Sequence, residues 1–257
     1  MGTKRRHRRP LLPALCVAIV AAALVAAGCG GDDDDSDPTV TTSGGSSTAA
    51  AAAGPSTDDP VALDCKKVEA AKSKPADYGA PPQTVKKGEK LTAVVKTSCG
   101  SFEIQLDTKR SPTTVNSFVF LAEKGFYDGL TFDEAAEGTY LHGGDPPGKA
   151  TGPGYTVKGE VPEGIIYRRG VIAMAESGKA QPPLSGSQFF ISVADPWIDM
   201  SGIYPPIGRV EKGLKVLEGI SEFGPQAPDT PYNTGVIGPV GKLDRIVTIE
   251  DVSIAKG

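Results

Sequence analysis

A small group of polar side chains in the middle of the chain has the residue types needed for proton exchange or metal binding: Asp133, Glu134, His142 and Asp145. Three interpretations are open. His142 donates a hydrogen bond beside Glu134, the group binds a metal ion, or the side chains are simply solvated. We favour solvated side chains. Acid–base catalysis by paired carboxylates, as in glycosidases, is disfavoured because adjacent strand residues such as Asp133 and Glu134 point to opposite faces.

These polar residues lie in a region of short apolar strands. Alternating apolar side chains predict a hairpin over residues 91–107 and strands over 130–135, 139–142, 170–175, 188–193, 207–210 and 245–254. With this assignment, Glu134 and His142 would face each other on adjacent strands.

Two helices are expected beside the strands. Ser111 suits the N-cap and Pro112 the first turn of a helix that ends at Gly125. A second, shorter helix is indicated by the apolar residues Leu214, Val216, Leu217 and Ile220. Two helices are too few for a βα repeat. The sequence therefore predicts a mainly β fold, a closed antiparallel barrel with helices covering its ends.

Composition agrees with a strand-rich fold and argues against nucleic-acid binding. The 257 residues include 32 Gly and 22 Pro, about a fifth of the chain against roughly an eighth in average proteins. This excess disfavours a helical bundle or a coiled coil. The net charge is −4, and from Pro60 onward 22 basic residues nearly balance 24 acidic ones. A nearly neutral domain lacks the basic surface that nucleic acids require.

The first 28 residues have the pattern of a secretory signal. A basic stretch precedes an apolar run, and Ala26–Cys29 resembles the bacterial site at which lipid is attached to cysteine. We expect cleavage before a lipidated Cys29, which would anchor the protein to the outer face of the cytoplasmic membrane. The alternative is an uncleaved anchor, since the run is just long enough to span a bilayer.

The remaining chain divides into three segments with different compositions. Residues 29–59 are acidic and rich in Ser, Thr and Ala, so we expect a disordered tether. Residues 60–90 form an N-terminal extension, and residues 91–257 form the barrel domain. Cys65 and Cys99 remain after the signal and the lipidated cysteine are set aside. In an oxidising compartment we expect a disulfide that ties the extension to the first hairpin.

Several motifs in register resemble the cyclophilin family of peptidyl-prolyl isomerases. They occur at residues 100–104, 111–118, 125–132, 143–145, 170–175, 185–191, 197–199 and 208–210. The resemblance extends from about residue 91 to 254. It implies an eight-stranded barrel whose surface groove binds Xaa-Pro segments of secreted or unfolded proteins, without a cofactor or metal.

The resemblance also implies a mechanism and a set of site residues. Amide resonance resists rotation about the bond to proline, and the family weakens it with an arginine that donates to the prolyl nitrogen. Phe190 matches the floor of the proline pocket, Gln188 a carbonyl contact and Ala175 the rim. Trp197 and Ile198 match the wall beside the proline ring.

This sequence departs from the family pattern on the catalytic side of the groove. Glu134 stands at the position of the catalytic arginine, and an ionised carboxylate only accepts hydrogen bonds. Thr139, followed by Tyr140, replaces a pocket phenylalanine. His142 replaces the glutamine that supports the arginine, and Tyr204 stands where histidine is common.

Two functions follow from these departures. The first is an extracytoplasmic isomerase that assists protein folding, with catalysis impaired by Glu134. The second is a non-catalytic, membrane-tethered module that binds proline-containing segments. In either case we expect a monomer that interacts with polypeptides and the membrane, but not with nucleic acid.

Overall fold

The computed structural model describes residues 63–69, 77–146, 152–176, 184–193, 203–225 and 239–257, which belong to one compact unit, Pro55–Gly257. The predicted signal and tether, with Cys29, lie outside the described residues, as do Trp197 and Ile198. No helix in the described part of the chain is long and apolar enough to cross a bilayer.

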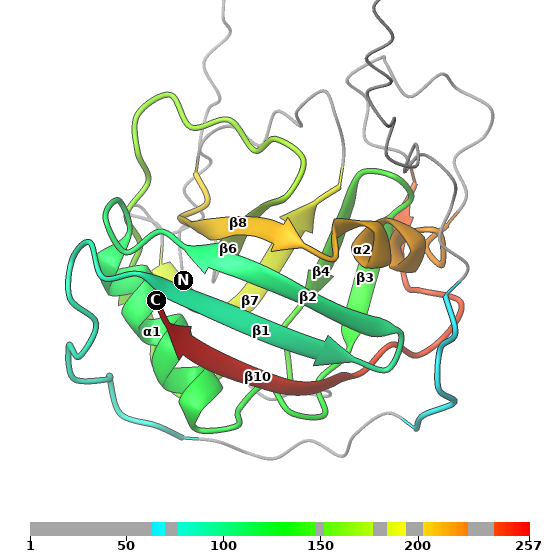
Figure 1. Ribbon diagram of the computed structural model, residues 1–257, viewed down its shortest axis with the longest axis horizontal. Coiled ribbons are helices and arrows are strands. Elements are labelled where there is room, and N and C mark those ends of the chain that lie inside the picture. Colours follow the sequence, from blue (N-terminus) through cyan, green and yellow to red (C-terminus); the bar gives the residue numbers. More distant parts are fainter. Residues whose placement is uncertain (1–62, 70–76, 147–151, 177–183, 194–202, 226–238) are drawn as a thin grey trace, which may run out of the picture. The chain divides into compact units, whose positions relative to one another are not determined.

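A strongly curled antiparallel sheet forms the body of the domain (Figure 1). Its strands are β1 (Leu91–Thr97), β2 (Gly100–Leu106), β3 (Phe132–Ala136), β4 (Tyr140–Gly143), β5 (Val157–Lys158), β6 (Val171–Glu176), β7 (Leu184–Ser192), β8 (Pro206–Lys212), β9 (Val240–Gly241) and β10 (Ile249–Lys256). Their order is β10-β1-β2-β8-β6-β7-β4-β3-β9, and β5 pairs with β7.

The predicted fold is confirmed, with two differences in detail. Eight of the ten described strands have four or more residues, and the two extra strands, β5 and β9, have two residues each. The sheet closes through one isolated bridge, between Thr131 and Thr248, rather than along a continuous strand pair. The predicted strand over 245–254 therefore begins at Ile249, because the residues before it form this closure.

Helix α1 (Pro112–Glu123) lies near one end of the curled sheet and α2 (Leu214–Ser221) near the other (Figure 1). The Ser111 hydroxyl does not cap α1, contrary to the role expected for an N-cap serine. The carboxylate of Glu160 accepts hydrogen bonds from the backbone N–H groups of Thr113 (2.7 Å) and Thr114 (3.0 Å) instead. At the other end Gly125 has φ +62° and its N–H bonds to the Ala122 carbonyl, as predicted for a C-terminal glycine.

Apolar side chains on the inner face of the sheet form the main core with helix α1. Alternate residues of β1 and β2 are buried, including Val95, Phe102 and Ile104, because successive side chains of a strand point to opposite faces. A second, smaller apolar cluster consists of Ala136, Tyr140, Tyr167, Val171, Ala173 and Phe190. Its members come from β3, β4, β6 and β7 and from the loop before β6.

The N-terminal extension is attached to the barrel at several places along its length. Cys65 and Cys99 form the predicted disulfide, which joins the extension to the turn between β1 and β2. Further along, the Asn116 side chain accepts hydrogen bonds from the N–H groups of Thr84 and Val85 (2.8 and 2.9 Å). The extension is thus part of the folded domain.

Candidate functional site

A bulge in β3 determines how the polar residues of β3 and β4 meet. Glu134 and His142 are partners in the β3–β4 register, as predicted, but the register shifts between Phe132 and Glu134, at Asp133. The His142 Nδ1–H donates to Asp133 at 3.0 Å. Glu134 accepts a hydrogen bond from the Tyr140 hydroxyl at 2.8 Å. These two pairs differ both from the Glu134–His142 pair that the sequence left open and from the solvated side chains that it favoured.

Negative charge surrounds the His142 imidazole. Burial lowers the pKa of His142, but the hydrogen bond to Asp133 and the charges of Asp133, Glu134 and Asp145 outweigh burial and raise the pKa above its usual value. Burial, followed by the hydrogen bond to Glu134, raises the pKa of Tyr140 well above its usual value. Tyr140 is therefore a permanent hydrogen-bond donor to Glu134 near neutral pH.

Three aromatic rings pack together beside the polar pairs. Phe190 is only 2% exposed, and its ring centre lies 5.2 Å from that of Tyr204 and 5.5 Å from that of Tyr167. The Tyr167 hydroxyl donates to the Tyr204 carbonyl (2.8 Å) and accepts from the Tyr204 N–H (2.9 Å). Burial raises the pKa of Tyr167 to about 12. The two hydrogen bonds to Tyr167 hold Tyr204 against Phe190.

Strand register brings residues of β4, β6 and β7 into one row. His142 pairs with Phe190, and Phe190 pairs with Ala173 on the other side. Gln188 is half-buried two residues before Phe190, and Ala175 is buried two residues after Ala173. The β6–β7 register shifts between Met174 and Glu176, so Ala175 and Gln188 lie at this irregularity, next to the row and not in it.

Thr139 has a local role in the turn between β3 and β4. Its hydroxyl donates to the Glu137 carbonyl at 3.1 Å, and its N–H bonds to the Ala136 carbonyl at 2.9 Å. The side chain is partly exposed. A residue of this size and polarity does not supply the apolar surface that the resemblance assigns to its position.

Tyr167 is a site residue that the sequence did not reveal. It precedes β6 in a loop without alternating apolar residues, so no periodic pattern distinguishes it. Within the described residues, Glu134 has no ion pair with lysine or arginine. No group of three or more His, Cys, Asp or Glu side chains in this part of the chain is placed to hold a metal ion.

Comparison with known sequences identifies relatives of one kind. The family described as cyclophilin type peptidyl-prolyl cis-trans isomerase/CLD matches residues 92–241. A peptidyl-prolyl cis-trans isomerase B from Bacillus subtilis is 41% identical over 122 residues, which cover 46% of this chain and 82% of that protein. A peptidyl-prolyl cis-trans isomerase-like 1 from Neurospora crassa is 35% identical over 144 residues, covering 53% and 85%.

Solved structures agree on the fold. A cyclophilin type peptidyl-prolyl cis-trans isomerase from Cryptosporidium parvum superposes with a TM-score of 0.54 at 24% identity. The match covers 65% of this chain and 99% of that one. A second structure of that protein, determined in the presence of the dipeptide Ala-Pro, gives a TM-score of 0.53.

Proposed function

We propose, from the premise that this chain belongs to the cyclophilin-type peptidyl-prolyl cis-trans isomerase family, that it binds Xaa-Pro segments outside the cytoplasmic membrane and isomerises them weakly. The observation that carries the proposal is the state of Glu134. Its carboxylate occupies the position that the family resemblance assigns to the catalytic arginine, and it accepts a hydrogen bond from Tyr140.

Weak catalysis follows from the hydrogen-bonding capacity of these groups. Rotation about the prolyl bond is slow because amide resonance sets a barrier of about 18–20 kcal/mol. A donor to the prolyl nitrogen weakens that resonance, whereas an ionised carboxylate has no proton to donate. The Tyr140 hydroxyl is already committed to Glu134. The loss of one preorganised donor commonly lowers a rate by about a hundredfold or more.

His142 is the residual donor of the site. Its Nδ1–H is held by Asp133, which leaves Nε2–H for a ligand when the imidazole is charged. The raised pKa favours that charged form. His142 therefore supplies a low level of catalysis, and its loss would leave a module that only binds proline-containing segments, the second candidate function.

An isomerase assay on the full chain tests the proposal. With a protease-coupled Ala-Pro peptide, we expect kcat/KM to be about a hundredfold or more below that of a relative that has arginine at this position. Turnover equal to that of such a relative would contradict impaired catalysis. No binding of any Xaa-Pro peptide would contradict both candidate functions.

The acidic surroundings of the groove also predict a preference among peptides. Asp133, Glu134 and Asp145 all act on the same imidazole electrostatically, so their charges converge on the groove. We expect peptides with Lys or Arg beside the proline to bind more tightly than acidic ones, and the difference to shrink at high salt. Equal affinities, measured by calorimetry, would refute this preference.

A further inference from the structure

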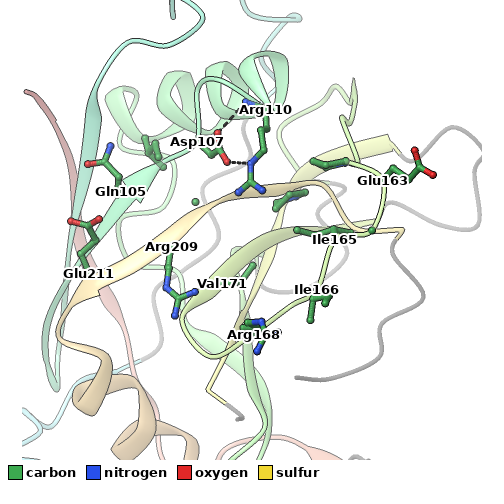
Figure 2. A pocket seen from close by; sticks show the side chains of 15 residues that line it. Gln105, Asp107, Arg110, Glu163, Ile165, Ile166, Arg168, Val171, Arg209 and Glu211 are labelled. Atoms are coloured by element: carbon green, nitrogen blue, oxygen red, sulfur yellow. Dashed lines mark hydrogen bonds and ion pairs between the residues drawn. The ribbon is translucent and has the colours of Figure 1, made fainter. Parts of the chain in front are cut away.

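A second pocket lies on the outer face of β2, β8 and β6, beside the loop that contains residues 162–168 (Figure 2). Its volume is about 490 Å³, within the usual range for ligand sites. The apolar part of its lining consists of Leu106, Pro162, Ile165, Ile166, Val171 and Pro206. Ile166 is 39% exposed, one of the few large apolar side chains of the described residues that reach solvent to this extent.

Three arginines contribute positive charge to this pocket. Arg110 is bonded to Asp107, as Figure 2 shows. Arg168 and Arg209 form no ion pair with any residue that the structure describes. Two guanidinium groups beside exposed apolar surface thus remain available to an anionic ligand.

Two of the three carboxylates of the lining lie at its margins, and the third, Asp107, is paired with Arg110. In Figure 2 the Glu163 carboxylate points away from the three arginines, and Glu211 lies beyond Arg209, next to Gln105. Neither glutamate forms an ion pair with a described residue. The middle of the pocket is therefore cationic, while its rim carries two negative charges.

Strand register and a tight turn place the two unpaired arginines. Arg209 of β8 pairs with Gln105 of β2 on one side and with Val171 of β6 on the other. Arg168 lies in the turn that leads into β6, where its carbonyl accepts the Val171 N–H at 2.9 Å. The backbones of both arginines thus lie beside the same residue of β6, Val171.

The loop over residues 162–168 connects this pocket to the aromatic cluster. Tyr167 is buried and holds Tyr204, whereas its neighbours Ile166 and Arg168 are exposed and line the pocket. Val171 contributes to the aromatic cluster and to the pocket wall. One short loop therefore contributes to two different binding surfaces.

We propose that this pocket is an exosite for an acidic peptide segment that carries aliphatic side chains next to its carboxylates. The guanidinium groups of Arg168 and Arg209 bind the carboxylates. The exposed Ile166 and its apolar neighbours bind the aliphatic side chains. The exosite is independent of proline recognition, because its lining includes none of the polar residues of the prolyl groove.

Two features favour a peptide over the other anionic ligands that arginines attract. A small free anion would leave the apolar walls uncovered. A membrane surface is flat, whereas the site is concave, so a membrane would not reach the apolar walls inside the pocket. An extended peptide can place carboxylates and aliphatic side chains inside the pocket together.

Fluorescence anisotropy with the full chain tests the exosite. The probe is a labelled peptide of alternating Glu and Leu without proline, and its partner is the same peptide with Lys in place of Glu. We expect only the Glu peptide to bind, more weakly as salt increases. The double change Arg168→Gln with Arg209→Gln should weaken binding by about tenfold or more.

A matched pair of changes controls for net charge. Lys96 and Lys256 are exposed on β1 and β10, and neither lines the pocket. Lys96→Gln with Lys256→Gln removes the same charge, so we expect binding within about twofold of the unchanged protein. The arginine variant should retain its melting temperature, because Arg168 and Arg209 are exposed.

Several outcomes would overturn the proposal. One is an equal loss of affinity for the Glu peptide in the arginine and the lysine double variants. The others are equal affinities for the Glu and Lys peptides, or no binding of the Glu peptide. Displacement of the Glu peptide by an equal concentration of succinate would show a simple anion site. Displacement by vesicles of anionic lipid would show a membrane contact. Because the probe lacks proline, none of these outcomes bears on the prolyl groove.

Discussion

At the scale of single residues, Glu134 is central to the weak catalysis that we propose. Its carboxylate accepts from Tyr140, and its neighbour Asp133 accepts from His142, so two acids and two donors form closed pairs. Each of these four side chains therefore has a hydrogen-bond partner within the protein. This pairing leaves only the Nε2–H of charged His142 as the donor that we propose for a ligand, which agrees with the low isomerase rate that we propose.

Restoring a donor at this position should restore activity. We expect Glu134→Arg to raise kcat/KM by about tenfold or more, because arginine presents several N–H donors and an acidic neighbour, Asp133, remains beside it. The protease-coupled assay measures the change. Glu137→Arg makes the same charge change three residues away and should have little effect. An unchanged rate in Glu134→Arg would show that Thr139 and the buried Phe190 limit catalysis as much as the missing donor.

The Asp133–His142 pair predicts a pH dependence of stability. The pKa of His142 is raised in the folded state, so the pair contributes fully below the unfolded pKa of about 6.5 and its contribution is lost as pH rises through the folded pKa. The Asp133 side chain is 42% exposed, which limits the effect to about 1 kcal/mol or less. In urea titrations, His142→Gln should destabilise the protein more at mildly acidic than at alkaline pH. The opposite trend would contradict a raised pKa.

Helix α1 shows how a distant residue supports one element. Glu160 accepts from Thr113 and Thr114 at the helix N-terminus, where a negative charge also interacts favourably with the helix dipole. Burial raises the pKa of Glu160, but these hydrogen bonds outweigh it and lower the pKa overall. The stabilisation is therefore present above the unfolded pKa and is lost as pH falls through the folded pKa.

Removal of this charge should weaken the helix. We expect Glu160→Gln to reduce the free energy of unfolding by about 1 kcal/mol at neutral pH, and by less in acid, where Glu160 is itself protonated. Chemical denaturation at both pH values measures the difference. Glu163→Gln, an exposed glutamate without an ion pair to a described residue, is the control. A cost that did not change with pH would argue against the charge as its cause.

The disulfide joins the N-terminal extension to the turn between β1 and β2, where the Lys66 N–H also bonds to the Ser98 carbonyl at 2.8 Å. Cys65 and Cys99 are 34 residues apart, and closing a loop of that length stabilises a protein by about 3–4 kcal/mol in the chain-entropy model. We expect Cys65→Ser with Cys99→Ser to lower stability by about this amount. A reductant should lower the stability of the unchanged protein alone, so an equal effect on the double variant would contradict the assignment.

At the scale of the whole molecule, the sequence that precedes the folded domain predicts where the protein is located. We propose that Cys29 carries lipid, on the strength of the signal-like segment before it and of the disulfide, which suits an oxidising compartment. Metabolic labelling with a fatty acid should label the protein, and Cys29→Ser should abolish both the label and membrane retention. Retention of Cys29→Ser in the membrane fraction would favour an uncleaved anchor.

At the same scale, the two binding surfaces that we propose have opposite charge. The prolyl groove is acidic around His142, and the proposed exosite is cationic around Arg168 and Arg209. The loop with Tyr167 contributes to both, since Tyr167 holds Tyr204 while its neighbours line the second pocket. A client with a basic residue near its proline and an acidic segment elsewhere would satisfy both surfaces.

Local patterns predicted the elements more reliably than their contacts. The alternation in β1 and β2 and the helical spacing after Pro112 depend on neighbouring residues, and both predictions are confirmed. The prediction that Ser111 caps α1 was wrong. Ser111 directly precedes the helix, whereas the residue that caps it, Glu160, lies 46 residues from Thr114. No local pattern indicates a partner at such a distance.

The sequence by itself determined which chemical groups this protein has: a carboxylate at Glu134 that cannot donate, a histidine at position 142, and two cysteines for a disulfide. Residue type is sufficient for such statements, because the capacity to donate or accept belongs to the side chain. Only the tertiary structure decided which groups meet. The register shift at Asp133 gave His142 its partner, and folding of a loop without periodic pattern placed Tyr167 against Tyr204. The first contact depends on strand register, and the second joins residues that are far apart along the chain. No local sequence pattern indicates either of them.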